Sequence, residues 1–394
     1  MPTDTTAAPP YPLADWGERG IATFRDRTGA PALRDLRGAG LLVERALANG
    51  FAVPGAVSAG GGCRLLRAKD GWVALNLSRQ DDRDLAPALF LDGDVGSSST
   101  AIAAAMLQWD AKDIVARGRE LGLAIAGLDE TAHSPPIDLT GIGTARKARP
   151  RRPLVIDLSA LWAGPLAGHL LWLAGAEVVK VESSRRPDAM RDGDPGLFAL
   201  INQGKANVAL DLKDAADRDA LIALIGRADM VIEAARPRAL LQLGIDADAL
   251  VRSVPGLVWV TITGHGVADD AADWVGFGDD CGVAGGLSAA LRDATGTIGF
   301  VGDAIADPLT GITAANAAWE RWSLGTGGRI ALSMSGVVRT ALLEERTRNP
   351  AAFGSLLRQW AAAMGQPIAV GPMRTPSAPV AMPGADNGAW LTPC

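Results

Sequence analysis

The amino-acid sequence predicts an α/β protein in which a parallel sheet is covered by helices on both faces. Short apolar runs of strand length recur after residue 153, beginning with LVIDL at 154–158. Helical patterns lie between most of these runs, and the clearest spans 213–229. Strands that alternate with helices form parallel sheets. The chain has 394 residues, enough for more than one domain, so we expect a smaller region beside this sheet.

An N-terminal arm and a first helix are predicted at the start of the chain. We expect residues 1–30 to form the arm, loose over 1–20. Residues 31–50, PALRDLRGAGLLVERALANG, are predicted to be helical. We expect this helix to end at Gly50, because glycine is favoured directly after a helix.

A smaller region of mixed helix and strand is predicted over 31–132. Two apolar stretches within 58–78 are separated by Asp70-Gly71, which predicts a hairpin. Residues 98–125 return to helix in two segments. The stretch 133–153 is rich in proline and glycine and then basic, so we expect a linker between the smaller region and the large one.

The region 154–394 is predicted to hold the large sheet. Its strand candidates are LVIDL (154–158), EVVKVE (177–182), NVALDL (207–212), MVIEA (230–234) and LVWVTI (257–262). After them we expect a helix over about 307–323, a strand over 328–334 and a helix over 335–346. The tail from 368 has five prolines and predicts extended segments at a sheet edge.

The composition and charge argue against several kinds of function. A formal net charge of −6 disfavours a nucleic-acid surface, although it allows a local basic pocket for phosphates. The three cysteines, Cys63, Cys281 and Cys394, form no CxxC pair and the histidines are far apart, so we predict no metal site. Few cysteines and no signal-peptide pattern predict a cytoplasmic protein. The apolar stretch 158–179 contains Pro165 and Glu177, so we predict a buried strand–helix–strand unit and no membrane span.

No nucleotide-binding fingerprint follows a predicted strand. The patterns GxGxxG and GxxxxGK[ST] are missing there, which disfavours a nicotinamide dehydrogenase or a nucleotide triphosphatase. Gly164-Pro165 after the first strand fits an anion-binding turn and a plain tight turn equally well. Basic residues recur beside strand ends, either as solvated surface or as contacts to a ligand, and their repeated position favours a phosphate-bearing ligand.

Four motifs, in order and at suitable spacing, resemble the class III CoA-transferases of the CaiB/BaiF type. They are LVIDLSALWAGPLAGHLLWLAGAEVVKVE (154–182), NQGKANVALDLKD (202–214), LVWVTITGHG (257–266) and VGDAIADPLTG (301–311). The family includes formyl-CoA and carnitine CoA-transferases and α-methylacyl-CoA racemases. The resemblance implies a Rossmann-like large domain that binds CoA over 154–394, and a homodimer whose two chains can be interlocked.

The order of the smaller region differs from the usual family order. Residues 58–78 and 111–130 resemble the family's small domain, which ordinarily follows the first part of the large domain. Here they precede it, so the chain resembles a circular permutation. Whether this order preserves the interlocked dimer is left open by the sequence.

The resemblance places the catalytic nucleophile at Asp307. As in the family, a small residue and a glycine follow it three and four positions later, here Thr310 and Gly311, whereas Asp303 does not occupy that position. The glycine run Gly60, Gly61 and Gly62 corresponds to a mobile active-site loop that can approach a ligand closely.

The CoA-contacting positions carry over unevenly from the family. Ala163 and Lys205 match the family's residue types. Five positions differ in residue type from family transferases of known specificity: Trp162, Ser183, Ala234, Ala235 and Gln242. Asn202 and Arg236 belong to the same predicted CoA-binding set, and we expect Arg185 and Arg238 to substitute for missing charges.

The resemblance implies transfer of CoA from an acyl-CoA donor to a carboxylic acid, with CoA as substrate and no tightly bound cofactor. Asp307 would carry the acyl group as an anhydride and then CoA as a thioester, which is covalent catalysis. A racemase is disfavoured, because Phe277 stands where that branch has a histidine base. A non-catalytic acyl-CoA-binding protein of the same fold is the other alternative.

Local rules alone give Asp307 another role. An aspartate directly before Pro308 predicts a helix N-cap with proline at the first helical position. An unperturbed aspartate has a pKa of about 3.9, so we expect Asp307 to be ionised at neutral pH without a base.

Overall fold

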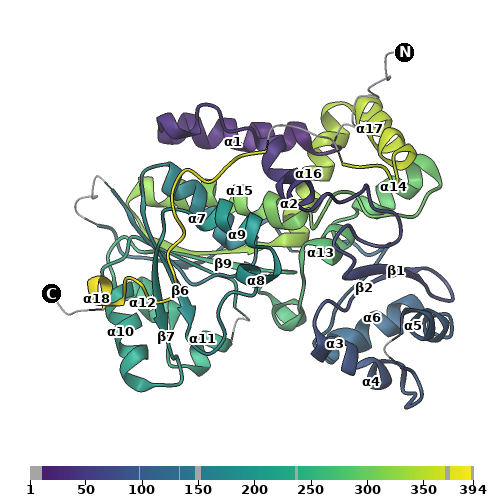
Figure 1. Cartoon of the computed structure of the whole chain (residues 1–394), viewed down its shortest axis with the longest axis horizontal. Helices are drawn as coiled ribbons and strands as arrows, with labels where there is room; N and C mark the ends of the chain where they lie inside the picture. Colours follow the sequence, from purple (N-terminus) through teal and green to yellow (C-terminus); the bar gives the residue numbers. More distant parts are fainter. Residues whose placement is uncertain are drawn as a thin grey trace.

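The computed structural model describes residues 11–96, 98–132, 134–146, 152–235, 238–368 and 373–391. Two sheets organise the chain: a seven-stranded sheet enclosed by helices, and a three-stranded sheet with its own small helices beside it (Figure 1). The predicted α/β class with a larger parallel sheet and a smaller α+β region is therefore confirmed.

The large sheet has the strand order β4-β10-β9-β8-β5-β6-β7. Its strands are β4 (Ile137–Ile142), β5 (Leu154–Asp157), β6 (Glu177–Ser183), β7 (Ala206–Leu210), β8 (Met230–Glu233), β9 (Val258–Thr263) and β10 (Gly328–Ser333). All neighbours pair in parallel except β4 with β10. The six parallel strands follow the order 3-2-1-4-5-6 of doubly wound sheets, whose ligand crevice opens where the order reverses, here between β5 and β8.

Alternate residues of the strands face two different apolar layers. Val155, Val178 and Met230 pack in the larger core, against α7 (Ala163–Leu173) and α15 (Ala306–Leu324). Ile156, Val179 and Val231 face the opposite layer, with α10 (Ala215–Ile225) and α12 (Ala247–Ser253). A sheet buried on both faces explains why the strand candidates read as continuous apolar runs.

The other helices of this part cover its edges and the end near the smaller sheet (Figure 1). Their bounds are α8 (Met190–Gly193), α9 (Pro195–Asn202), α11 (Ala239–Gln242), α13 (Gly278–Ala284), α14 (Leu287–Thr295), α16 (Met334–Arg348), α17 (Pro350–Ala362) and the 3₁₀ turn η2 (Asp269–Asp273). The apolar stretch 158–179 forms α7 and the start of β6, as predicted. In the described part of the chain, no helix is both long and apolar enough to cross a bilayer.

The smaller sheet is antiparallel, with the order β1-β2-β3. Its elements are β1 (Cys63–Arg67), β2 (Trp72–Asn76), β3 (Ala124–Gly127), α3 (Gln80–Asp84), α4 (Ala86–Phe90), α5 (Ser99–Met106) and α6 (Ala111–Glu120). Arg67 pairs with Trp72, so the hairpin turns at Asp70-Gly71 as predicted. The two helical segments expected within 98–125 are α5 and α6.

The N-terminal segment is more ordered than we expected. Residues 14–28 form α1 (Ala14–Thr28), and the first 3₁₀ turn (Pro31–Leu33) and α2 (Gly38–Asn49) follow it. Gly17, Ile21 and Phe24 are buried at helical spacing, which fixes α1 against α2 and α15 in place of a loose arm. Gly50 ends α2 in the left-handed conformation, as predicted.

The expected linker over 133–153 contains the edge strand β4. Ile137 to Ile142 pair antiparallel with β10, with a register irregularity between Arg329 and Ile330. Most of β4 is exposed, so its sequence lacks the apolar run that marks a central strand. His133 and residues 147–151 lie outside the described residues.

The C-terminal tail lies along β7, at the edge of the large sheet, where the sequence predicts it. The amides of Asn207 and Ala209 donate to the side chains of Asp386 and Asn387. The last helix, α18 (Asn387–Trp390), follows directly. The prolines leave too few N–H groups for a regular ladder, so side chains complete this edge.

Candidate active site

A cavity of about 730 Å³ opens at the carboxyl ends of the parallel strands, where strand order reverses. We call it the Asp307 cavity. Residues at and after the ends of β5, β6 and β8 line it, namely 158–162, 181–183, 186–190, Ala235, Ala239, Leu240 and Leu243. The smaller region contributes Gly60, Gly62 and the segment 76–79. The cavity therefore lies between the two parts of the chain, and each contributes a wall.

Asp307 lies in the first turn of α15 but does not cap it. The N-cap is Ile305, so the predicted assignment of Asp307 as N-cap and Pro308 as first helical residue is wrong. Asp279 accepts a hydrogen bond from the amide of Ala304 (2.9 Å), and Ala304 has a positive φ of 41°, so the chain turns before the position we expected. The Asp307 carboxylate is thereby left to face the cavity.

The first residues of two helices lie against the Asp307 carboxylate. The amide of Ala163, the first residue of α7, donates to it. Gly278, the first residue of α13, lies so close that a Cβ there would overlap the Asp307 carboxylate and the Ala304 carbonyl. Helix N-termini carry partial positive charge, and this arrangement suits negative charge that forms on or beside Asp307.

Three carboxylates share one guanidinium at the floor of the cavity. Arg45 donates to both oxygens of fully buried Asp303, at 2.9 and 2.7 Å. Burial raises the pKa of Asp307 to about 7, opposed by the charge of Arg45 and reinforced by that of Asp279. Burial likewise raises the pKa of Asp303 to about 6. The expectation that Asp307 is fully ionised at neutral pH is therefore wrong, because its surroundings are not those of a solvated carboxylate.

Arg45 is a site residue that sequence reasoning missed. It belongs to α2, and its guanidinium lies over the rings of Phe51 and Trp162 at 5.7 and 5.5 Å. A signal was present: Arg45 shares a helical face with Leu41 and Leu42, which are buried. A charge at a core position of an amphipathic helix is a candidate for a buried ion pair.

The predicted glycine loop reaches the same cavity. Gly60 and Gly62 line it, and a Cβ on Gly60 would come within 2.7 Å of Arg45 Nη2. Gly61 has a φ of +77°, which favours glycine. The loop therefore needs its glycines both for close approach and for backbone conformation.

The structure brings about half of the predicted CoA-binding residues together. Trp162, Ser183 and Ala235 line the Asp307 cavity. Ala163 and Ala234 line a smaller cavity of about 230 Å³ that also reaches Asp307. Arg186 is one of the basic residues beside strand ends but was not in the predicted CoA-binding set; it is exposed, lines the Asp307 cavity, and forms no ion pair within the described residues.

The remaining predicted CoA-binding residues lie elsewhere. Lys205 is buried and donates to Asp157 (2.8 Å) and Asn202 (3.0 Å). Arg185 pairs with Asp211 at 2.6 Å and Arg238 with Asp273 at 3.6 Å. Gln242 is exposed at the end of α11, and Arg236 lies outside the described residues. Basic residues at strand ends are thus largely occupied by internal acids, which the sequence pattern did not reveal.

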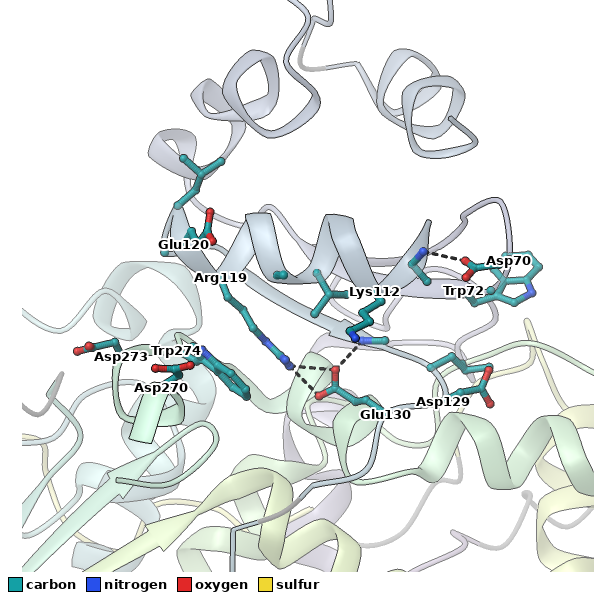
Figure 2. A pocket seen from close by; sticks show the side chains of 18 residues that line it. Asp70, Trp72, Lys112, Arg119, Glu120, Asp129, Glu130, Asp270, Asp273 and Trp274 are labelled. Carbon is teal, nitrogen blue, oxygen red and sulfur yellow. Dashed lines mark hydrogen bonds and ion pairs between the residues drawn. The ribbon is translucent and has the colours of Figure 1, made fainter. Parts of the chain in front are cut away.

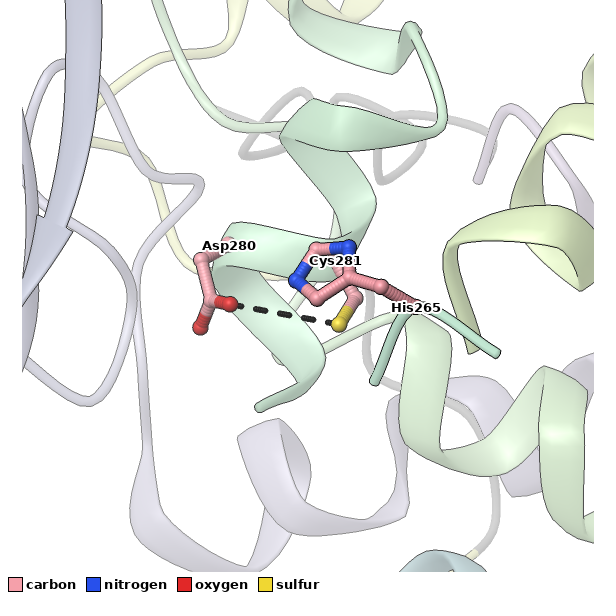
Figure 3. Close-up of side chains that lie close together, drawn as sticks. All are labelled: His265, Asp280 and Cys281. Carbon is pink, nitrogen blue, oxygen red and sulfur yellow. Dashed lines mark hydrogen bonds between the residues drawn. The ribbon is translucent and has the colours of Figure 1, made fainter. Parts of the chain in front are cut away.

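Three potential metal ligands come together beneath the site (Figure 3). His265, Asp280 and Cys281 are buried, with ligand atoms within 4.8 Å of one another. Asp280 accepts the amide of Phe277, and the Cys281 thiol donates to the carbonyl of Gly264. Burial lowers the pKa of His265 to about 3 and raises that of Asp280 to about 8. Two of the three groups thus have protein partners, and the absence of a metal site stays a prediction.

A larger hollow of about 1080 Å³ lies beside α6 and is lined by the segments 111–122, 127–130 and 270–274 in part (Figure 2). We call it the α6 hollow. Arg119 extends from α6 to Glu130, with bonds of 2.7 and 2.9 Å, and its guanidinium lies 3.8 Å from the ring centre of Trp274. Arg119 and Glu130 are thus paired with each other, and Asp129 pairs with Arg292 from outside the lining.

Known proteins resemble part of the chain. The sequence profile of CoA-transferase family III matches residues 153–354. A succinyl-CoA–D-citramalate CoA-transferase of Chloroflexus aurantiacus is 32% identical over 45% of this chain and 48% of its own length. An acetyl-CoA:oxalate CoA-transferase of Acetobacter aceti is 29% identical over 48% of this chain and 52% of its own. The solved structure of a CaiB/BaiF family protein from Brucella suis aligns over 52% of this chain and 58% of its own, with 24% identity and a TM-score of 0.43.

The match is limited in extent. The chain spans about half the length of the curated relatives it matches. The matched residues belong to the part with the large sheet, and the profile leaves 31–132 unmatched.

Proposed function

Because the chain belongs to CoA-transferase family III, we propose that it transfers CoA from an acyl-CoA donor to a carboxylic acid, with Asp307 as nucleophile. One observation carries the proposal. Asp307 is a carboxylate at the junction of two cavities, and the N-terminus of α7 donates a hydrogen bond to it. The donors and acids that relatives are named for, such as succinyl-CoA and oxalate, belong to those proteins and serve here as candidates.

The reaction begins with attack of a carboxylate oxygen of Asp307 on the thioester carbonyl. The C–S bond breaks, CoA leaves as thiolate, and a mixed anhydride remains on Asp307. The thiolate then attacks the aspartyl carbonyl and releases the donor's acyl group as a carboxylate, which leaves an aspartyl-CoA thioester. Two easier exchanges thus replace one difficult exchange.

The second half reverses these events with the acceptor. Its carboxylate attacks the aspartyl-CoA carbonyl, the thiolate leaves, and a second anhydride forms. The thiolate attacks the acceptor's carbonyl, which gives the new acyl-CoA and frees the Asp307 carboxylate. Backbone N–H groups at the starts of α7 and α13 would stabilise the tetrahedral oxyanions. Gly60 and Gly62 would exclude water, which hydrolyses anhydrides.

Binding of the CoA part requires cations that the family's usual positions lack here. Arg185 and Arg238 are paired with aspartates, so we propose Arg186 in their place. Arg186→Gln should weaken CoA binding, and the loss should shrink as salt rises.

The resemblance also leads us to propose a homodimer, which light scattering coupled to gel filtration would test.

The central test is the variant Asp307→Asn, which keeps the size of the side chain and removes the nucleophile. We expect transfer to fall by at least about 1,000-fold. Asp293→Asn is the matched control, because Asp293 is exposed and, within the described residues, pairs with neighbouring Arg292. Mass spectrometry after donor acyl-CoA and hydroxylamine should place the modification on Asp307. Modification elsewhere, or transfer by the variant at wild-type rate, would contradict the mechanism.

A non-catalytic acyl-CoA-binding protein is the second candidate, favoured by the small uncharged residues Ser183, Ala234 and Ala235 at CoA-contacting positions. CoA binding measured by calorimetry, with no transfer over a panel of formyl-, acetyl-, succinyl- and longer acyl-CoA donors, would support it. The racemase alternative is weaker still, because Phe277 faces the cavity and the described lining contains no histidine.

A further inference from the structure

Two cavities of different size meet at Asp307. The Asp307 cavity of about 730 Å³ and the small cavity of about 230 Å³ share Arg79, Ala160, Leu161, Ala235, Phe277 and Asp307. A thioester carbonyl joins the CoA sulfur to the acyl chain. A nucleophile that attacks this carbonyl must therefore stand where the CoA side and the acyl side meet, which is the position of Asp307.

The walls of the small cavity are mostly apolar, and the hydroxyl of its threonine, Thr263, is hydrogen-bonded to the Leu332 carbonyl and the Gly266 amide. Ile262, Met334 and Val275 line it, together with alanines and glycines. Apart from Asp307, its charged lining residue is Arg79, whose guanidinium donates to both oxygens of Asp82 at 2.8 and 2.6 Å. The same guanidinium lies 5.3 Å from the ring centre of Phe277. Within the described residues, this lining offers no unpaired cation to a second carboxylate.

Trp274 separates the small cavity from the α6 hollow. It lines both, and Figure 2 shows it at the hollow side, across from Arg119. The Arg119 guanidinium lies over its ring, and the ring of His265 meets it edge-on, with centres 5.7 Å apart. The indole is therefore held in place between the small cavity and the much larger α6 hollow.

We propose that the small cavity binds the acyl group, that it selects an uncharged acyl chain, and that Trp274 sets the upper limit of its length. The proposal rests on the proposed function and adds the substrate class. At roughly 30 Å³ for each water-sized group, the cavity holds about seven non-hydrogen atoms. A second carboxylate on the chain would lose its hydration without a partner, which is unfavourable.

Binding of stable CoA thioethers tests the proposal without turnover. Titrate the full-length wild type by calorimetry with S-propyl-, S-hexyl- and S-dodecyl-CoA, and with S-(3-carboxypropyl)-CoA. Affinity should rise about fourfold per methylene up to the hexyl chain, because apolar surface is buried, and should fall for dodecyl. The carboxypropyl compound should bind at least about tenfold more weakly than its uncharged analogue.

Two variants and a control test whether Trp274 sets the limit on acyl-chain length. Trp274→Ala joins the small cavity to the α6 hollow and should make S-dodecyl-CoA the tightest ligand. Ala272→Leu narrows the small cavity and should move the optimum toward S-propyl-CoA. Trp72→Ala is the control, since Trp72 lines the hollow but not the small cavity, and its optimum should stay at hexyl.

An unchanged chain-length optimum in folded Trp274→Ala would overturn the role of Trp274, and tighter binding of the carboxypropyl compound would overturn the uncharged acyl class. Either result leaves the proposed function intact if transfer still depends on Asp307. Conversely, thioether binding with the expected length limit and no transfer by any donor would refute transfer alone. Absence of binding by every thioether would overturn the assignment of the cavity.

Discussion

The Asp307 cavity and the α6 hollow differ in how their charged groups are paired. In the hollow, which is larger, Glu130 has Arg119, and Asp129 has Arg292 at 2.6 Å. At Asp307, three carboxylates surround one guanidinium, and Arg45 is engaged by Asp303. Acids of the hollow for which the described residues supply no ion-pair partner, such as Glu120 and Asp270, are exposed to solvent, whereas the carboxylates around Asp307 are buried. Buried carboxylates with a raised pKa are typical of functional sites, which is why we propose the reaction for the smaller cavity.

The largest effect on activity, after loss of Asp307 itself, is expected from Gly278→Ala. The added Cβ would overlap the Asp307 carboxylate and the backbone of Ala304, so the nucleophile must move. A displacement near 1 Å can lower kcat/KM by about 100-fold. Gly282→Ala in the same helix is the control, because its Cβ meets only Ile305 Cγ2, at 3.1 Å. Wild-type activity in Gly278→Ala would show that the close packing at Asp307 is unimportant.

The pH dependence of transfer should report the charge imbalance at Asp307. The nucleophile must be ionised, and its pKa is raised to about 7, so kcat/KM should fall about tenfold per pH unit below that value. If kcat/KM instead began to fall only near pH 4, Asp307 would behave as a solvated carboxylate.

The same shift affects stability. The folded pKa lies above the unfolded value of about 3.9, so ionisation of Asp307 lowers the free energy of unfolding as pH rises from about 4 to about 7. Asp307→Asn should therefore raise Tm at pH 8 by roughly 1–3 °C and leave it unchanged at pH 4. Thermal melts at the two pH values provide the measurement.

Arg45→Gln should shift the pH below which kcat/KM falls, and so tests how the charges around Asp307 set its pKa. Arg45 lowers the pKa of Asp307, so its loss should raise this pH and reduce activity at pH 7 severalfold. Buried Asp303 would lose its partner, at a cost of up to about 3 kcal/mol unless it takes up a proton. The double variant Arg45→Gln/Asp303→Asn should recover Tm. Arg37→Gln, at the exposed start of the same helix, should change neither property.

The smallest effect is expected in the α6 hollow. Glu130→Gln removes one partner of a largely buried ion pair with Arg119, which should lower stability but removes no group that lines the Asp307 cavity. Steady-state kinetics with the best donor should differ from wild type by less than about twofold. A large loss of activity would mean that the α6 hollow, and not the Asp307 cavity, governs the reaction.

Much of the fold was predictable because its elements have local causes. Apolar runs such as 154–158 and 257–262 became central strands, since a sheet buried on both faces needs apolar residues on both. Asp70-Gly71 became a hairpin turn. The edge strand β4 and helix α1 were missed, because an exposed strand has no apolar run, and α1 buries only Gly17, Ile21 and Phe24 along one narrow face.

By itself, the sequence determined the class of fold and the order of its motifs, and it is the basis for proposing Asp307 over Asp303 as nucleophile. Only the tertiary structure decided the surroundings of Asp307. Arg45 comes from a helix more than 250 positions away, with a separation of 258 from Asp303. Asp279 turns the chain so that Asp307 faces the cavity instead of capping its helix. Burial then raises its pKa, and burial depends on which distant segments pack together, a property that spacing along the chain does not encode.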